Sequence, residues 1–231
     1  MQLIELKSVY KRYSNGVPAL NDVSLTISKG EFVFVIGASG SGKSTLIKLL
    51  YRQEKPTSGE IYVGGINVAK LRNGKVYKLR RKLGVVFQDY KLLPKKTVYE
   101  NVAFALECVG AKDKEIRPKV LDALERVGLK ERVRSYPGEL SGGEQQRVCI
   151  ARAIVNDPKW IICDEPTGNL DPKTSMEVMD VLLAINKLGT TILMVTHDID
   201  IVDRIKKRVI VLDSGRILKD YKEGEYVNES M

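Results

Sequence analysis

The stretch FVFVIGASGSGKSTLIKLLY, residues 32–51, decides the fold of this chain. It places the apolar run FVFVIG before a glycine-rich segment and the helical pattern TLIKLLY after it. The segment between them, GASGSGKST, fits the pattern G-x-x-x-x-G-K-[ST]. A flexible Gly/Ser turn is the alternative, and the flanking strand and helix argue against it. The order of strand, glycine-rich loop and helix predicts a phosphate-binding loop in an α/β protein.

The residue types of this loop predict a purine nucleoside triphosphate and Mg²⁺ as its ligands. Glycines let backbone N–H groups turn toward phosphate oxygens. Lys43 is expected to reach the β- and γ-phosphates and to assist catalysis, and the Ser44 hydroxyl to ligate Mg²⁺. The predicted nucleotide-binding residues of the loop are Gly37, Ser39, Gly40, Ser41, Gly42, Lys43, Ser44 and Thr45.

Three further apolar runs, GVVFQ, WIICDE and ILMVTH, end at side chains that can do chemistry. These side chains are Gln88, Asp164 with Glu165, and His197. The runs do not alternate polar with apolar residues, which is typical of parallel strands covered on both faces. Ligands of open α/β sheets bind beyond the carboxyl ends of the strands. We therefore expect these side chains to meet the phosphate-binding loop in one site.

Each of these side chains has a predicted role and a structural alternative. Asp164 is placed to hold Mg²⁺ through water, and Glu165 to orient and polarise the attacking water. A solvated carboxylate pair is the alternative, and a phosphate-binding loop in the same chain weakens it. His197 is the only histidine of the chain. It is predicted to contact the γ-phosphate, and a structural histidine is the alternative.

The remaining pattern completes an α/β fold with a mostly parallel sheet. The N-terminal segments LIELKSVYKRY, LNDVSLTI and GEIYVGGINV alternate and are separated by turn residues, which predicts a small antiparallel β layer. TVYENVAFALECVG and IRPKVLDALERVGL have helical spacing and end at Gly110 and Gly128. We expect one domain, 1–231, with a core (1–88 and 156–220), a helical subdomain (89–155) and a polar tail (221–231).

The charge balance favours anionic partners. Lys plus Arg number 38 against 29 Asp plus Glu, a net charge of +9, which suits nucleotide, nucleic acid or lipid headgroups. The basic run KLRNGKVYKLRRK, residues 70–82, is typical of a solvated helix face, and anionic lipid or nucleic acid are the alternatives.

Cysteine usage and hydropathy indicate where the chain works. Cys108, Cys149 and Cys163 match no metal spacing, so we expect buried thiols in a reducing compartment. The N-terminal MQLIELKSVY lacks the features of a signal peptide. No run approaches the roughly 18 apolar residues that span a bilayer. A membrane role is therefore expected to come through a partner.

A second glycine pair occurs in GELSGGEQQR, residues 138–147. Ser141 and Glu144 have the spacing of a capping box at a helix start. Gly142 and Gly143 weaken the first turn of a helix. Their presence predicts an anion that approaches the positive end of the helix closely.

With these motifs the chain resembles the ATP-binding-cassette ATPases along nearly its whole length. LSGGEQQ resembles the family signature, GNLD (168–171) the D-loop and His197 the switch histidine. Gln88 resembles the glutamine that joins Mg²⁺ to the helical subdomain, and Tyr13 the aromatic that stacks on adenine, with Tyr10 as the alternative. The resemblance implies further nucleotide contacts from Tyr13, Ser141, Gly142, Gly143, Gln145 and Asp171. It implies Ser44, Gln88 and Asp164 at the metal, and Glu165, His197, Gln88 and Lys43 in catalysis.

The same resemblance implies a homodimer that closes on two ATP molecules. In the family, the signature of one subunit covers the γ-phosphate that the other subunit's loop binds. VVFQDYKLLPKKTVYENVA and DEPTGNLD narrow the resemblance to ATPases that work with membrane proteins of cell-division, lipoprotein-release and macrolide-efflux systems. We expect a peripheral subunit at the cytoplasmic face of the membrane that controls cell-wall hydrolysis in cell division. A subunit of a lipoprotein-release or macrolide-efflux transporter is the alternative.

If the chain has such an integral membrane partner, the candidates for the contact are Tyr90, Leu92, Leu93 and Pro94. The alternative is that these residues only fill the core of the helical subdomain.

Two other classes of ATPase are weaker candidates. A DNA-repair ATPase of the superfamily carries a long coiled coil between the two glycine motifs, and the segment from Lys43 to Ser141 is too short for one, so no nucleic acid is expected. Glu165 argues against a scaffold that binds ATP without turnover.

Overall fold

The computed structural model of the protein describes residues 2–223. Within these residues the chain folds into two compact units, one made of residues 2–80 with 191–223 and one of Arg81–Thr190. The predicted polar tail, 221–231, lies outside the described residues from residue 224 onward. The predicted split into core and helical subdomain stays a prediction.

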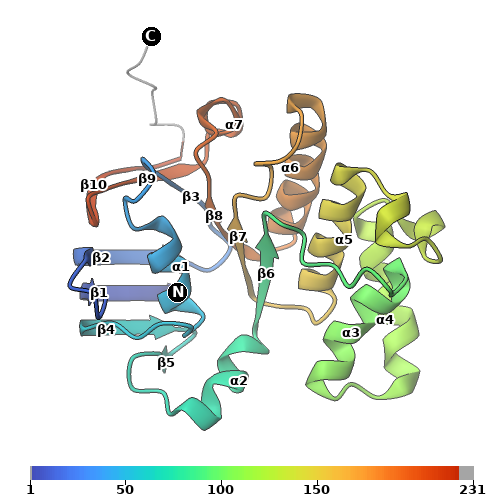
Figure 1. Cartoon of the computed structure of the whole chain (residues 1–231), viewed down its shortest axis with the longest axis horizontal. Helices are drawn as coiled ribbons and strands as arrows, with labels where there is room; N and C mark the ends of the chain where they lie inside the picture. Colours follow the sequence, from blue (N-terminus) through green and yellow to red (C-terminus); the bar gives the residue numbers. More distant parts are fainter. Residues whose placement is uncertain (1, 224–231) are drawn as a thin grey trace. The chain divides into compact units, whose positions relative to one another are not determined.

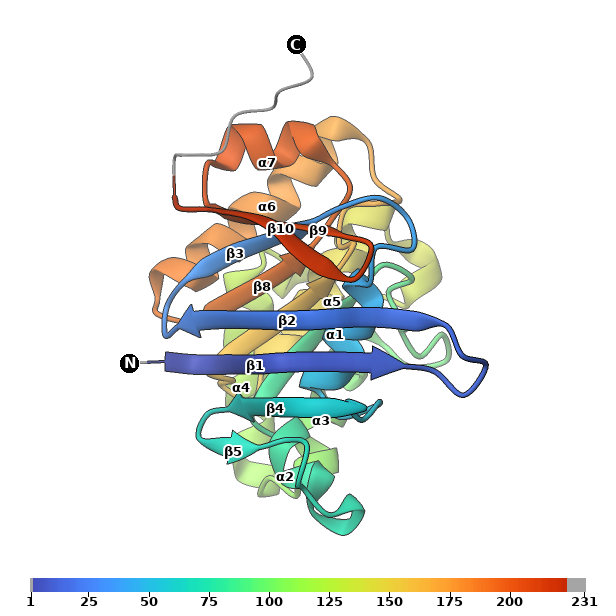
Figure 2. The ribbon, with the colours of Figure 1, turned by 90° about the vertical axis from the view of Figure 1, so that its left-hand side faces the viewer.

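The first unit contains two sheets. Its elements are β1 (Gln2–Arg12), β2 (Pro18–Ser28), β3 (Phe32–Ile36), α1 (Lys43–Leu50), β4 (Ser58–Val63), β5 (Ile66–Asn67), a 3₁₀ turn (Asn73–Lys75), α2 (Val76–Arg80), β8 (Thr191–Val195), α7 (Ile199–Ile205), β9 (Arg208–Asp213) and β10 (Arg216–Tyr221). Strands β2, β1, β4 and β5 form an antiparallel sheet in that order (Figure 2). This sheet confirms the predicted antiparallel layer, and its alternating burial follows from one face packing inward.

The second sheet of this unit positions the phosphate-binding loop. β3 pairs in parallel with β8 on one side and β9 on the other, and β10 pairs antiparallel with β9. All residues of β3 and β8 are buried. The continuous apolar runs therefore form parallel strands covered on both faces, as predicted. Val35 lies opposite Val195, so the carboxyl ends of β3 and β8 meet at one edge.

The second unit combines a pair of parallel strands with four helices (Figure 1). Its elements are β6 (Leu83–Phe87), α3 (Val98–Val109), α4 (Asp113–Arg126), 3₁₀ turns (Lys130–Arg132 and Pro137–Glu139), α5 (Gly142–Ile154), β7 (Trp160–Asp164) and α6 (Pro172–Lys187). α5 contacts β6, α3, α4 and α6. It is the central helix of this unit.

The helix boundaries follow the capping signals in the sequence. Thr97 caps α3 in a box with Glu100, and α3 ends at Gly110, whose φ is 76°. Ser141 caps α5 in a box with Glu144, as predicted. Gly128 follows α4 with φ of 71°. Both predicted glycine ends are therefore left-handed residues that suit glycine.

The cysteine prediction is wrong for one residue. Cys149 and Cys163 are buried, and burial raises the pKa of both thiols. Cys108 is exposed. It lies four residues after Phe104, which is 41% exposed, so both occupy the outer face of α3.

None of the helices within residues 2–223 is long and apolar enough to cross a membrane. In the basic run, Val76 and Leu79 of α2 are buried, whereas Lys70, Lys75 and Lys78 are exposed. The run therefore exposes its lysines to solvent and packs inward through two apolar side chains, Val76 and Leu79.

Candidate functional site

The phosphate-binding loop connects β3 to α1 and presents the start of that helix. Gly42 is the N-cap of α1, and no side chain caps the helix there. The Lys43 ammonium donates hydrogen bonds to the carbonyls of Gly37 (2.6 Å) and Ala38 (2.9 Å). Ser44 is exposed and Thr45 is buried. Backbone N–H groups at the start of a helix attract anions, so this loop can bind phosphate.

The glycines of the loop have structural reasons within the first unit. A Cβ on Gly37 would lie 2.0 Å from the Leu212 carbonyl oxygen of β9, and one on Gly42 2.5 Å from the Ala19 carbonyl oxygen of β2. Gly40 has φ of 81° and no neighbour within 4 Å of such a Cβ. The loop is therefore held against two strands at its ends and is left-handed and open at its middle.

Ser41 carries a buried polar atom in this loop. Ser41 is 3% exposed, and its hydroxyl oxygen has no hydrogen-bond partner among the described residues. Burying a hydroxyl without a partner is unfavourable. An oxygen-rich ligand in the loop would supply that partner.

Tyr13 contacts the loop helix. The Tyr13 hydroxyl lies 3.1 Å from the Thr45 hydroxyl oxygen. The Lys11 ammonium lies 4.8 Å from the centre of the Tyr13 ring, and Glu54 holds it at 2.8 Å. Tyr10 lies on β1, is 37% exposed and pairs with β4 at Ser58. The structure thus places the predicted stacking residue beside α1, and stacking itself stays a prediction.

His197 lies at the same sheet edge as the loop. The Thr196 N–H donates to the Val35 carbonyl (3.2 Å), which continues the β3–β8 pairing to the residue before His197. The loop begins at Gly37, directly after the last residue of β3. Within the first unit, the fold therefore brings together the loop, Tyr13 and His197, three separate parts of the predicted site.

The second unit brings Gln88, Asp164 and Glu165 together at the carboxyl ends of its two strands. β6 and β7 are parallel, and Phe87 lies opposite Asp164. The Gln88 amide donates to the Asn169 side-chain oxygen (3.3 Å), and the Asn169 amide donates back to the Gln88 carbonyl (3.4 Å). Asn169 was not among the predicted site residues, although it lies within GNLD.

Glu165 has an unusual backbone. Its φ is 50°, in the left-handed region, and its carbonyl accepts a hydrogen bond from the Gly168 N–H (3.1 Å). A left-handed residue with a side chain costs about 1–2 kcal/mol. Such strain persists where the surrounding structure holds it and clusters at functional sites.

The signature segment is a helix N-terminus built on a reciprocal capping box. The Ser141 hydroxyl accepts from the Glu144 N–H (3.2 Å), and Glu144 accepts from the Ser141 N–H (2.9 Å). This backbone hydrogen bond is the main cause that lowers the pKa of Glu144, and Arg132 adds to it. The Gln145 amide donates to the Leu140 carbonyl (3.1 Å). Glu144 is thus engaged in the cap.

The glycines of the signature lie close to side chains from other parts of the second unit. Gly143 is buried, and a Cβ on it would lie 2.2 Å from the Thr174 methyl carbon of α6. A Cβ on Gly142 would lie 2.9 Å from the Tyr90 hydroxyl. Close packing on Thr174 therefore accounts for Gly143 without an anion, whereas a side chain at Gly142 would meet the movable end of the Tyr90 side chain. Their contact with a nucleotide stays a prediction.

Asp171 caps α6 and is tied to the same threonine. It accepts from the Lys173 and Thr174 N–H groups (3.1 Å each) and from the Thr174 hydroxyl. The hydrogen bonds from Thr174 are the main cause that lowers the pKa of Asp171. Thr174 therefore links Asp171 to Gly143. Its spacing of three residues from an aspartate before proline is the sequence signal that could have found it.

The segment predicted to meet a membrane partner is partly buried and firmly held. Tyr90, Leu92 and Leu93 are half-buried, and Pro94 is exposed. The fully buried Asn101 accepts from the Leu93 N–H (2.7 Å) and donates to the Leu93 carbonyl (3.1 Å). These residues form a fixed surface loop with one side against the core. The structure thus leaves both predicted roles open.

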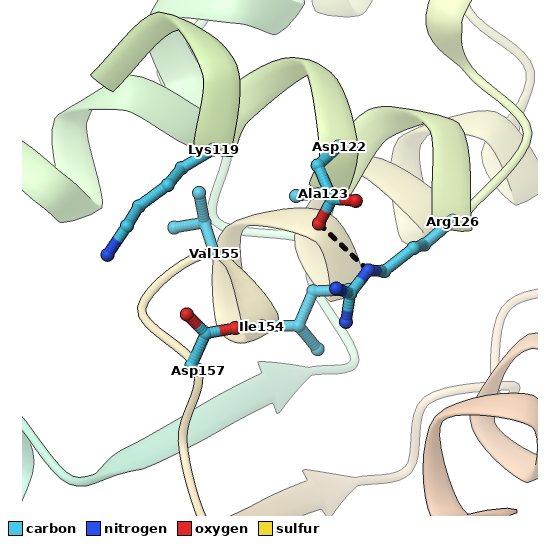
Figure 3. Close-up of a pocket in the computed structure, with 7 residues that line it drawn as sticks. All are labelled: Lys119, Asp122, Ala123, Arg126, Ile154, Val155 and Asp157. Atoms are coloured by element: carbon cyan, nitrogen blue, oxygen red, sulfur yellow. Dashed lines mark ion pairs between the residues drawn. The ribbon is translucent and has the colours of Figure 1, made fainter. Parts of the chain in front are cut away.

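The small cavity in Figure 3 does not belong to the predicted site. It lies in the second unit between α4 and the end of α5 and is lined by Lys119, Asp122, Ala123, Arg126, Ile154, Val155 and Asp157. Asp122 and Arg126 form an ion pair at its rim (2.9 Å). Its volume of about 20 Å³ suits about one water molecule, which is far smaller than a nucleotide.

A strand–loop–helix phosphate site in one unit and a capped LSGG helix in the other define an ATP-binding-cassette ATPase. The sequence model of the ABC transporter family matches residues 20–168, and the chain belongs to this family. It has the fold of these cassettes, binds ATP and is an ATPase.

Within the family, the chain is similar to cell-division proteins. It is 56% identical over 224 residues to the cell division ATP-binding protein FtsE of Bacillus subtilis (strain 168), covering 97% of this chain and 98% of that one. Among solved structures it is similar to the dimeric bacterial ABC transporter cassette MJ0796, with 41% identity, a TM-score of 0.85 and coverage of 95% and 98% of the two chains. A second structure of that cassette is a post-hydrolysis dimer bound to ADP and phosphate (40% identity, TM-score 0.85, the same coverage).

Gly143→Ala and Thr174→Ser separate the packing role of Gly143 from its predicted role in ATP contact. We expect Gly143→Ala to lower the free energy of unfolding by about 1–3 kcal/mol because its methyl overlaps that of Thr174. Thr174→Ser removes this methyl and keeps the hydroxyl that bonds Asp171, so the double variant should regain most of the stability. Urea unfolding measures the free energy of unfolding of the single and the double variant.

ATP turnover then gives the second readout. If Gly143 also faces a nucleotide, the double variant stays well below wild-type turnover although it is folded. Wild-type turnover in the stable double variant would show that Gly143 is needed only for packing.

Proposed function

We propose that two copies of this chain close around two Mg²⁺–ATP and drive a conformational change in an integral membrane protein of the FtsX type. The change controls cell-wall hydrolysis during cell division. The observation that carries this proposal is the identity of 56% with an FtsE protein over nearly the full length of both chains. The chain then acts as a peripheral subunit at the cytoplasmic face of the membrane.

In this proposal, ATP binds to the phosphate-binding loop and to Tyr13 beside it. The uncapped start of α1, the glycine backbone and the unpartnered Ser41 hydroxyl fit a polyphosphate. Lys43 now bonds two carbonyls of its own loop and would exchange them for phosphate oxygens. Tyr13 would stack on the base, with Lys11 on the ring.

The oxygen donors of the predicted metal set fit Mg²⁺. Ser44 offers a hydroxyl, Gln88 an amide oxygen and Asp164 a carboxylate that would act through water. Within residues 2–223 no group of three or more His, Cys, Asp or Glu side chains could hold a metal ion alone. Mg²⁺ commonly takes one or two protein carboxylates together with substrate phosphates, so these three donors suffice. When bound, it offsets the negative charge of the phosphates.

Hydrolysis requires that a water be oriented and its proton accepted. The turn after β7 holds Glu165 in a left-handed conformation one residue beyond Asp164. We assign Glu165 as the group that orients the water and accepts its proton. His197 and Lys43 would bind the terminal phosphate, and Gln88 would position the metal.

Dimerisation gives the signature its role. Ser141, Gly142, Gly143 and Gln145 start α5, whose N-terminal dipole favours an anion. In a two-fold dimer each copy supplies one loop and one signature, which makes two equal sites. Asp171, next to the signature through Thr174, would line the same interface. The dimeric cassette of 41% identity supports this arrangement.

Glu165→Gln tests the proposed order of binding and hydrolysis. The amide keeps the shape of the side chain and cannot accept a proton at neutral pH, so ATP should bind and turnover should fall by about 100-fold or more. We expect a stable ATP-dependent dimer, measured by light scattering after gel filtration. Equal turnover in variant and wild type would remove Glu165 as the base, and a monomer with bound ATP would contradict the proposed dimer.

Leu92→Glu with Leu93→Glu tests the membrane contact. Two carboxylates on the half-buried loop should abolish co-purification with the FtsX-type protein while ATP binding remains, because the phosphate-binding loop lies in the other unit. Leu188→Glu is the control, since Leu188 is 72% exposed and lies at the end of α6. Retained co-purification would assign the two leucines to the core of the helical subdomain.

A further inference from the structure

Three side chains of α5 donate hydrogen bonds to the segment that contains Gln88. The Gln146 amide donates to the Phe87 carbonyl (3.3 Å), and the Cys149 thiol to the Tyr90 carbonyl (2.6 Å). Arg152 donates from Nη2 to the Tyr90 carbonyl (2.8 Å) and from Nη1 to the Lys91 carbonyl (2.6 Å). The donors are spaced three residues apart, so they follow one face of the helix.

These three side chains act as a clamp, because each of them donates to a backbone carbonyl of residues 87–91. Gln146 is fully buried, and its amide reaches a carbonyl rather than another side chain. Burial raises the pKa of the Cys149 thiol to about 12, although Arg152 lowers it, so the thiol keeps its proton at neutral pH and donates it. The Arg152 guanidinium is always charged and spans two successive carbonyls.

The clamped carbonyls belong to a strained turn. Tyr90 has φ of 56° and Lys91 has φ of 50°, two successive left-handed residues with side chains. Such a pair does not persist without support from its surroundings. The Lys91 N–H also donates to the Asp89 carbonyl, which tightens the turn. Both residues of the pair are held at their carbonyl oxygens by Arg152.

We propose that Arg152, with Gln146 and Cys149, is a positioning residue that fixes residues 87–91 to the signature helix, so that Gln88 and the start of α5 move as one element. The inference rests on the proposed roles of Gln88 and of the signature. A displacement of the loop at Tyr90–Pro94 by a membrane partner would then displace α5, and with it Ser141 and Gly143 at the start of this helix. Arg152 contacts neither nucleotide nor metal in this account.

Hydrogen exchange on the full nucleotide-free chain tests the clamp. Arg152→Gln removes a charged donor to two carbonyls, so amides of residues 88–93 should exchange about tenfold faster or more. Arg152→Lys, which keeps the charge and one donor, should show a smaller increase. The control Arg117→Met removes an exposed cation from α4 in the same unit and should leave this segment unchanged.

A rescue distinguishes the strained turn from general loss of packing. Asparagine tolerates the left-handed region better than lysine, and Lys91 is exposed, with its ammonium in an exposed ion pair with Asp89 (2.8 Å). Lys91→Asn should therefore restore part of the protection in the Arg152→Gln background. Unchanged exchange at 88–93 in Arg152→Gln, or no rescue, would overturn the clamp. Should Arg152→Gln not fold, Arg152→Lys decides: an increase confined to 88–93 supports the clamp, and one spread over α3 and α5 overturns it.

Turnover provides the functional readout. If the clamp positions Gln88, Arg152→Gln should lower kcat about tenfold while ATP affinity changes less than about twofold, and Arg152→Lys should recover part of kcat. A looser loop with wild-type kcat would overturn the link to Gln88. The exchange result is independent of dimerisation, since no nucleotide is present. Failure of the ATP-dependent dimer would therefore leave it standing, and the two proposals fail separately.

Discussion

An α-helix leaves the N–H groups of its first turn without partners inside the helix, and the function that we propose for this protein depends on two such ends. The first, at α1, is uncapped by any side chain and follows a glycine loop held against β2 and β9. The second, at α5, is capped by Ser141 and Glu144 and starts with two glycines. An anion with several negative oxygens, such as the triphosphate of ATP, suits both ends. In a two-fold dimer one copy offers the first end and its partner the second.

The helix α5 concentrates the connections of the second unit. At its start, Gly143 packs on Thr174, which also bonds Asp171. Along one face, Gln146, Cys149 and Arg152 hold the backbone on both sides of Gln88. The predicted signature, D-loop and metal glutamine are therefore joined through one helix. A cassette that must pass movement from a membrane partner to a nucleotide needs such stiff connections, because packed cores do not deform gradually.

The sequence predicted those features that depend on neighbours along the chain. The phosphate-binding loop, the buried parallel strands and the capping boxes at Thr97 and Ser141 are local patterns with local causes, and the structure contains them. Their order also identified the family.

Features that depend on tertiary neighbours were missed. Nothing near Gly143 in the sequence reveals Thr174, and nothing near Gln88 reveals Arg152, because α6 and α5 bring them there only after folding. Cys108 has an apolar surrounding sequence, yet it lies on the outer face of α3. Sequence patterns therefore predicted local structure better than they predicted which residues hold the candidate site in place.

The most direct measurement of the central claim, a nucleotide shared by two copies, uses two complementary variants in a Glu165→Gln background. One carries Lys43→Ala, which disables its loop, and the other Ser141→Arg, which blocks its signature, with a tag that alters its mass. Native mass spectrometry with ATP should find no dimers of either variant alone. The mixture should form heterodimers with one ATP, since only one complete site exists in such a pair. A mixture without heterodimers, or Ser141→Arg homodimers that hold two ATP, would contradict the account.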